Sequence, residues 1–217
     1  MNFIINNLNF KTMKKVIVLL SCVLAISAAS AQGKKGWLVY ELGIGTSHYG
    51  NYSPMSVFSD PTGNYSLLAT AYVSFGYRHN DGWFVGLTLN NDGGNTSFQS
   101  LNESFTNSSV MIDLRKVFEL GDRIELEAGV DLGLLIHRNS FDYFNDHFSF
   151  TRLGFSACSQ MGVNYLIKEN QTIGIRALFP CYGAMLSDKP ELPTGLLAND
   201  KTQTIGYSLQ VGYGIRF

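Results

Sequence analysis

TIGYSLQVGYGIRF, residues Thr204 to Phe217, is the stretch that decides the fold of this chain. Every odd-numbered position in it is apolar or aromatic, whereas the even-numbered positions carry Thr, Gly, Ser, Gln and Arg. Side chains of a β-strand alternate between its two faces, so this period of two predicts a strand. An apolar face as long as this one is typical of a strand that faces lipid.

The same alternation recurs along the chain and predicts an all-β fold of eight strands. Asn80-Asp81-Gly82, Leu120-Gly121-Asp122 and residues 168–171 are signals for tight turns. Long polar segments, expected to be loops, separate the other strands. Long and short connections that alternate in this way are typical of an eight-stranded antiparallel up-and-down transmembrane β-barrel with its tight turns on the periplasmic side. The other expected strands are 36–47, 67–78, 83–90, 110–118, 124–137, 150–167 and 173–179, and the expected long loops are 48–66, 91–107, 138–148 and 187–201.

The apolar rows are predicted to face outward. The lumen of an eight-stranded barrel is narrow and is filled by side chains, so eight rows of large apolar residues would overfill it. A lipocalin-like barrel, with the apolar rows inside, is the alternative, but Gly36 and Trp37 are adjacent where a Gly-x-Trp motif is expected, and no closing helix is evident. Charges turned into the lumen must be paired. The predicted lumen charge network is Glu41, Arg78, Asp113, Arg115, Glu125, Glu127, Asp131, Arg176 and Arg216.

The first 31 residues are expected to be a signal peptide. Lys14 and Lys15 precede a short apolar run, and small residues including Ala29 and Ala31 follow it. The apolar run is shorter than the roughly 20 residues that a membrane-spanning helix needs. Met13 is a candidate for the true start of the chain. Residues 32–217 form the predicted barrel domain.

The C-terminal residues also carry a resemblance to a known motif. Gln210, Gly212, Ile215 and Phe217 resemble the C-terminal insertion signal of bacterial outer-membrane barrels. With its strands and turns, the chain resembles the small outer-membrane β-barrel domains of the OmpX and OmpW sort. The resemblance implies a protein of the outer membrane of a Gram-negative bacterium, in contact with outer-membrane lipid and inserted by the barrel-assembly machinery.

Composition and cysteine spacing limit the partners, cofactors and disulfides that we expect of this chain. Charged residues make up 15% of the chain and the net charge is −1, so a nucleic-acid partner is not expected. No Cys or His pair has the spacing of metal ligands, and we expect no cofactor. Cys158 and Cys181 lie at similar heights on neighbouring strands, but alternation turns them to opposite faces. A disulfide between them needs a bulge near Pro180, so two unlinked thiols are the preferred prediction.

Histidines and loop aromatics supply the remaining candidate sites. His137 and His147, with Ser140, Asp142 and Asp146 nearby, would have to provide the base of a lipid-modifying enzyme or protease at the external rim. The ordinary polar composition of a loop explains the presence of these residues better than catalysis does. Tyr49 and Phe148 are expected in the outer aromatic belt, and Tyr52, Phe58 and Phe98 are the candidates for ligand binding at loop tips.

The sequence therefore predicts a non-catalytic outer-membrane barrel. Its lumen is plugged by polar side chains, and its external loops serve a structural or surface-interaction role such as adhesion, with a ligand that the sequence does not identify. An outer-membrane lipid-modifying enzyme and a narrow pore or conduit for hydrophobic compounds are the two alternatives.

Overall fold

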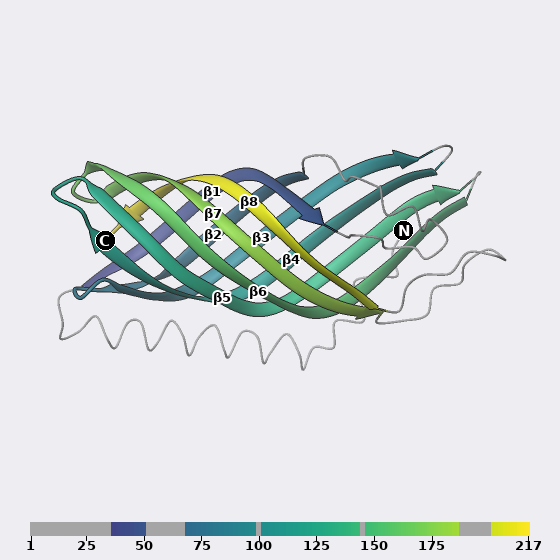
Figure 1. The fold of residues 1–217 in the computed structure, drawn as a ribbon, viewed down its shortest axis with the longest axis horizontal. Helices are drawn as coiled ribbons and strands as arrows, with labels where there is room; N and C mark the ends of the chain where they lie inside the picture. The colour runs from purple at the N-terminus through teal and green to yellow at the C-terminus, as the bar shows by residue number, and fades with distance from the viewer. Residues whose placement is uncertain (1–35, 51–67, 99–100, 144–145, 187–200) are drawn as a thin grey trace.

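The chain forms a closed barrel of eight antiparallel strands, each hydrogen-bonded to its neighbours in the sequence and β1 to β8. The computed structural model describes residues 36–50, 68–98, 101–143, 146–186 and 201–217. Figure 1 shows the strands tilted steeply across the barrel, with the C-terminus at the end that carries the tight turns. The predicted fold class is confirmed. The strands are β1 (Gly36–Gly50), β2 (Leu68–His79), β3 (Trp83–Phe98), β4 (Leu101–Glu119), β5 (Ile124–Tyr143), β6 (Asp146–Lys168), β7 (Gln171–Leu186) and β8 (Lys201–Arg216).

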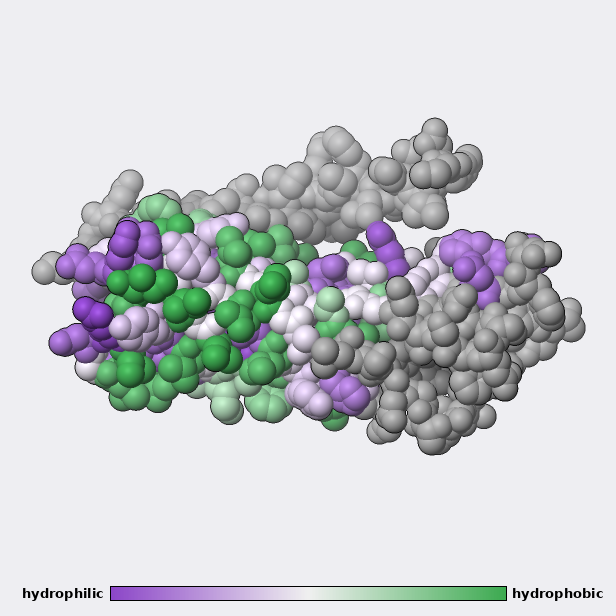
Figure 2. Space-filling model, turned by 90° about the horizontal axis from the view of Figure 1, so that it is seen from above, coloured by the Kyte–Doolittle hydropathy of each residue, from purple (hydrophilic) through white to green (hydrophobic). Residues whose placement is uncertain are grey.

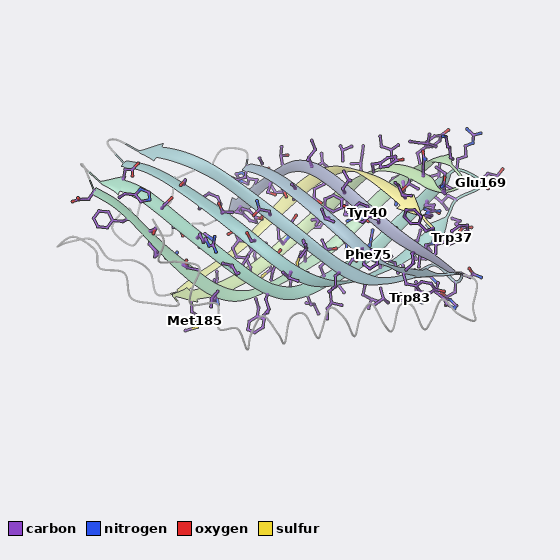
Figure 3. All side chains as sticks on the ribbon, turned by 180° about the vertical axis from the view of Figure 1, so that it is seen from behind. Trp37, Tyr40, Phe75, Trp83, Glu169 and Met185 are labelled. Carbon is purple, nitrogen blue, oxygen red and sulfur yellow. The ribbon has the colours of Figure 1, made fainter. Side chains whose placement is uncertain are left out.

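The apolar rows form the outer wall, as predicted. On β5, Leu132 and Leu134 are more than half exposed, whereas their neighbours Asp131 and Leu135 are buried in the lumen. Figure 2 shows apolar side chains covering much of the wall, with hydrophilic residues gathered at the ends. In Figure 3, Tyr40 and Phe75 lie on the wall, while Trp37, Trp83 and Glu169 mark the end with the tight turns. An apolar exterior around a polar interior is the arrangement expected of a barrel in lipid.

The prediction of long loops is wrong for two of the four segments. Residues 91–107 and 138–148 are mostly strand, with β3 paired to β4 as far as Phe98↔Leu101 and β5 paired to β6 as far as Tyr143↔Asp146. The alternation continues there: Asn107 is buried and Ser108 exposed. Outside the membrane the outward face of a strand is polar, so the loss of the apolar row marks the membrane boundary and not the end of the strand.

The tight turns form as predicted. Gly82 and Gly121 adopt positive φ angles of 88° and 79°, a conformation that glycine enters without steric cost. The described residues include no helix that is long and apolar enough to cross a membrane.

Pro180 affects the sheet on one side only. The ladder to β6 continues without a bulge through Cys158↔Pro180. The ladder to β8 passes from Leu178↔Ser208 to Cys181↔Ile205 with no pair between them. Proline has no backbone N–H to donate, so the interruption lies where its missing donor would have faced β8.

Candidate functional site

The lumen is a stack of polar layers, and the first lies at the end with the tight turns. Arg78 Nη1 donates to Glu125 Oε1 at 2.7 Å, and its Nη2 meets Glu119 Oε1 at 2.9 Å. Arg216 pairs with the other oxygen of Glu125. The side chain of Glu119 is mostly exposed at the rim, beside a cavity of about 280 Å³ that opens at this mouth. Glu119 was absent from the predicted network because the expected strand ended at Phe118, one residue before the end of β4.

The second layer joins two arginines to two glutamates. Arg176 donates to Glu41 at 2.6 Å and to Glu127 at 2.8 Å. Arg115 Nη1 donates to Glu127 at 2.9 Å, and its Nη2 lies 2.9 Å from Glu41. The guanidinium of Arg115 also stacks on the ring of Phe84, 4.1 Å from its centroid. The layer links strands from opposite sides of the barrel and leaves Arg115 1% exposed.

Asp113 and Asp131 form the third layer and differ in their partners. Asp113 Oδ1 lies 3.0 Å from Arg115 Nε, and its Oδ2 accepts hydrogen bonds from Thr88 and Ser74. Asp131 is not ion-paired to an arginine among the described residues, contrary to the prediction. The Nε2 of Gln160 instead donates to Asp131 at 2.6 Å and to Asp113 at 3.0 Å, so an amide bridges the two acids.

A fourth layer, which the sequence did not reveal, surrounds Asp92. This carboxylate is 3% exposed and accepts hydrogen bonds from Tyr49, from Thr70 Oγ1 at 2.9 Å and from Asn90 Nδ2 at 2.9 Å. Tyr49, predicted to belong to the outer aromatic belt, is therefore a lumen residue. The prediction ended the adjacent strands before these positions, where the alternation of buried and exposed side chains continues but the apolar outward row does not.

The external half of the lumen contains buried apolar and amide side chains. The buried apolar cluster here consists of Tyr49, Leu68, Phe105, Leu135, Tyr182 and Ala184. Asn107 donates to the hydroxyl of Tyr182 at 2.8 Å, and its Oδ1 hydrogen-bonds to His137 Nδ1. His137 is fully buried and also contacts Asn139. It is therefore a structural lumen residue rather than a base at the external rim, which corrects that alternative.

The cysteines are both free. Cys158 is buried in the lumen, and Cys181 is exposed on the outer wall. Their strands pair in continuous register, Ala157 with Cys181 and Cys158 with Pro180, so the bulge that a bridge requires is absent from this ladder. The candidate disulfide is not formed in the structure.

The external continuation of β3 to β6 carries a polar outward face. Ser104 and Ser140 hydroxyls lie 2.6 Å apart, and His147 Nδ1 lies 2.6 Å from Asp142 Oδ1. Both members of the His147–Asp142 pair are exposed. Among the described residues, the hydrogen-bond partner of the His147 ring is this carboxylate and not a serine hydroxyl. Tyr52 and Phe58 lie outside the described residues, and Phe98 ends β3.

The periplasmic rim of the wall combines aromatic and basic side chains. Trp83, Phe118, Tyr165 and Phe217 are exposed as a belt would require, but Tyr77 is buried. Lys116 Nζ lies 5.3 Å from the ring centroid of Trp83, and Arg123 donates to the hydroxyl of Tyr165 at 3.2 Å. In the β2–β3 turn, outside the membrane span, a hydrogen bond with His79 lowers the pKa of the Asp81 carboxyl.

A closed barrel with a lipid-facing apolar wall and a polar lumen is an integral outer-membrane β-barrel. The chain belongs to the family of the outer membrane protein beta-barrel domain, whose model matches residues 16–217. Its location is the outer membrane of a Gram-negative bacterium, where the wall contacts lipid. No functionally curated protein matches the chain.

Three solved structures show the same fold. Ail, the attachment invasion locus protein of Yersinia pestis, aligns with a TM-score of 0.52 and 16% identity over 84% of this chain and 99% of Ail. Neisserial surface protein A aligns with a TM-score of 0.51 and 15% identity over 84% of this chain and 97% of its own. The outer membrane protein AlkL aligns with a TM-score of 0.50 and 11% identity over 85% of this chain and 91% of AlkL.

Proposed function

We propose that this protein is a non-catalytic outer-membrane barrel that uses its external sheet to bind macromolecules at the cell surface. The observation that carries the proposal is the unequal length of the strands. β4, β5 and β6 contain 19, 20 and 23 residues, whereas β1, β2, β3, β7 and β8 contain 15, 12, 16, 16 and 16. Figure 1 shows the β3–β4 and β5–β6 hairpins reaching beyond the ends of the other strands.

The extended sheet has an edge on β3 that suits recognition. Among the described residues, the backbone of Asn95 to Phe98 pairs with β4 and not with β2. A strand edge of this kind presents backbone donors and acceptors to which an extended peptide adds as a further strand. The polar outward face of the same sheet, with Ser140 and Asp142, supplies side-chain contacts.

The filled lumen supports a scaffold role over a pore. Ion pairs and hydrogen bonds cross the interior in successive layers, and the apolar cluster around Phe105 and Tyr182 lies in the external half. A barrel cross-linked in this way holds its external sheet rigidly. Continuous water-filled conduction would require several buried ion pairs to break together.

The charge of the external sheet does not favour a polyanionic partner. Ail was solved with the heparin analogue sucrose octasulfate. Here Arg138 and His147 are exposed on the same sheet as Asp142 and Asp146. The described part of this surface therefore carries both basic and acidic side chains. We propose protein partners that offer an extended segment.

Photo-crosslinking on living cells tests the proposal. A photoreactive benzoyl-phenylalanine at Asp142 should form discrete protein adducts, whereas the same residue at Leu132 on the lipid wall should form none. In a trimmed variant, an Asn-Gly turn replaces Asn95–Ser104 and joins Gly94 directly to its partner Phe105. This variant should keep the heat-modifiable barrel and lose the adducts at Asp142.

Four results would refute this function. Adducts that persist after trimming would place the contact elsewhere, and adducts absent in all cells would remove the partner. Stepwise conductance of the purified protein in planar bilayers would favour the pore. An enzyme would instead lose a lipid-modifying activity on His147→Ala with the barrel intact.

We also propose that Gln210, Gly212, Ile215 and Phe217 are read by the barrel-assembly machinery. Phe217 is 72% exposed on the wall, and its backbone N–H and C=O bond to Leu38 at the β1–β8 seam. Phe217→Ala keeps these backbone bonds and removes the exposed ring. We expect a large drop in barrel inserted in cells but normal refolding into detergent, followed by heat-modifiability on gels. Phe118→Ala, an exposed aromatic on the same rim, is the matched control and should insert normally.

A further inference from the structure

Asp92 is a buried carboxylate whose contacts are with neutral groups. In the part of the chain that the structure describes, it accepts hydrogen bonds from the hydroxyls of Tyr49 and Thr70 and from the amide of Asn90. No ion pair joins Asp92 to an arginine among the described residues, and Arg115 and Arg176 of the second layer pair with Glu41, Glu127 and Asp113. A buried charge without a counter-charge is costly, so this position favours a positive partner.

A small cavity lies directly beside Asp92. Its volume is about 20 Å³, which is enough for one particle the size of a water molecule. One side of it is apolar and is lined by Met111, Leu135, Leu178 and Pro180, with Cys158. The residues with oxygen-bearing side chains that line it are Tyr49, Asn90, Asp92, Ser109, Ser156, Tyr182, Ser208 and Gln210. The polar side of the cavity therefore combines one carboxylate with amide and hydroxyl oxygens.

Gln210 gives an independent sign of a missing partner. Its side chain is 1% exposed, and its Nε2 donates to Thr70 and Asn90 at 3.2 Å each. Its Oε1 is buried and has no hydrogen-bond partner. Buried acceptors in native proteins are almost always satisfied, so an occupant of the cavity that interacts with oxygen atoms would complete the site.

We propose that this cavity binds a monovalent metal cation such as sodium. The oxygen atoms on the polar side of the cavity suit a hard cation, and a single carboxylate matches a single positive charge. Divalent calcium takes six to eight oxygens, often from several carboxylates.

The site also has a structural consequence. Asp92 lies on β3, Gln210 on β8 and Ser156 on β6, so a cation here would hold together strands from different sides of the barrel. Binding to the folded state alone stabilises it by mass action. The barrel should therefore be more stable in sodium chloride than in the chloride of a cation too large to enter.

The test compares refolded protein in detergent at one pH and one ionic strength, in sodium chloride and in N-methyl-D-glucamine chloride. The melting temperature should be higher in sodium by about 2 °C or more, and the shift should saturate with sodium concentration. Asp92→Asn should abolish the difference. Glu119→Gln, an equivalent change at the exposed rim, should keep it.

Tyr49→Phe provides a second variant that retains the carboxylate. It removes one neutral donor from Asp92, so its melting temperature should depend on sodium more strongly than that of the unmodified protein. Equal melting temperatures in the two salts for both proteins would overturn the proposal and leave water in the cavity. A sodium effect that survives Asp92→Asn would also overturn it, because the cation would then bind elsewhere.

Discussion

Replacing Arg115 with alanine is expected to lower the free energy of unfolding by about 3–5 kcal/mol, the usual cost of removing one partner from a buried ion pair. Arg115 contacts Asp113, Glu41 and Glu127 and is 1% exposed. Arg176 continues to pair with both glutamates in the variant, but Asp113 loses its cation. The measurement is urea unfolding of the barrel in liposomes, followed by fluorescence of Trp37 and Trp83.

Two further variants serve as controls for Arg115→Ala. Arg138→Ala removes an exposed arginine above the outer wall and should change stability by less than about 0.5 kcal/mol. Arg115→Met retains much of the side-chain volume on the ring of Phe84 but also removes the charge, so it separates lost packing from lost pairing. If Arg115→Ala were no less stable than Arg138→Ala, the lumen network would not be a source of stability.

The sequence predicted the barrel because one local rule, the period of two, specifies both the strands and their faces. Leu132 and Asp131 were assigned to opposite faces from this rule alone, and the structure confirms that assignment. The same rule failed at residues 91–107, where polar residues occupy both faces of the strands. In this segment β3 and β4 pair with each other, from Asn91↔Ser108 to Phe98↔Leu101, without an apolar outward row.

The partners within the lumen could not be predicted in the same way. A sequence pattern places Glu127, Arg115 and Arg176 inside, but which atoms meet depends on strand register and tilt across the barrel. Arg176 donates a hydrogen bond to Glu41, although the two residues are 135 positions apart in the chain. Asp131 illustrates the limit: it faces inward as expected, yet Gln160 reaches it in place of an arginine.

A depth series of arginine substitutions on β5 should reveal the position of the membrane. The outward apolar row runs from Ile124 to Ile136 and is followed by Arg138. At about 3.4 Å per residue and a tilt of about 40°, this row spans roughly 30 Å, close to the thickness of a bilayer core. Val130 lies at its centre and is 46% exposed.

Val130→Arg is therefore expected to cost about 2–4 kcal/mol, and Ile124→Arg or Ile136→Arg about 0–1 kcal/mol. An arginine near the bilayer midplane must leave water, whereas one near either interface reaches the headgroups. Val130→Met, which lengthens the side chain without a charge, is the matched control and should lie near zero. Unfolding in liposomes gives each value, and a cost independent of depth would mean that this face of β5 does not contact lipid.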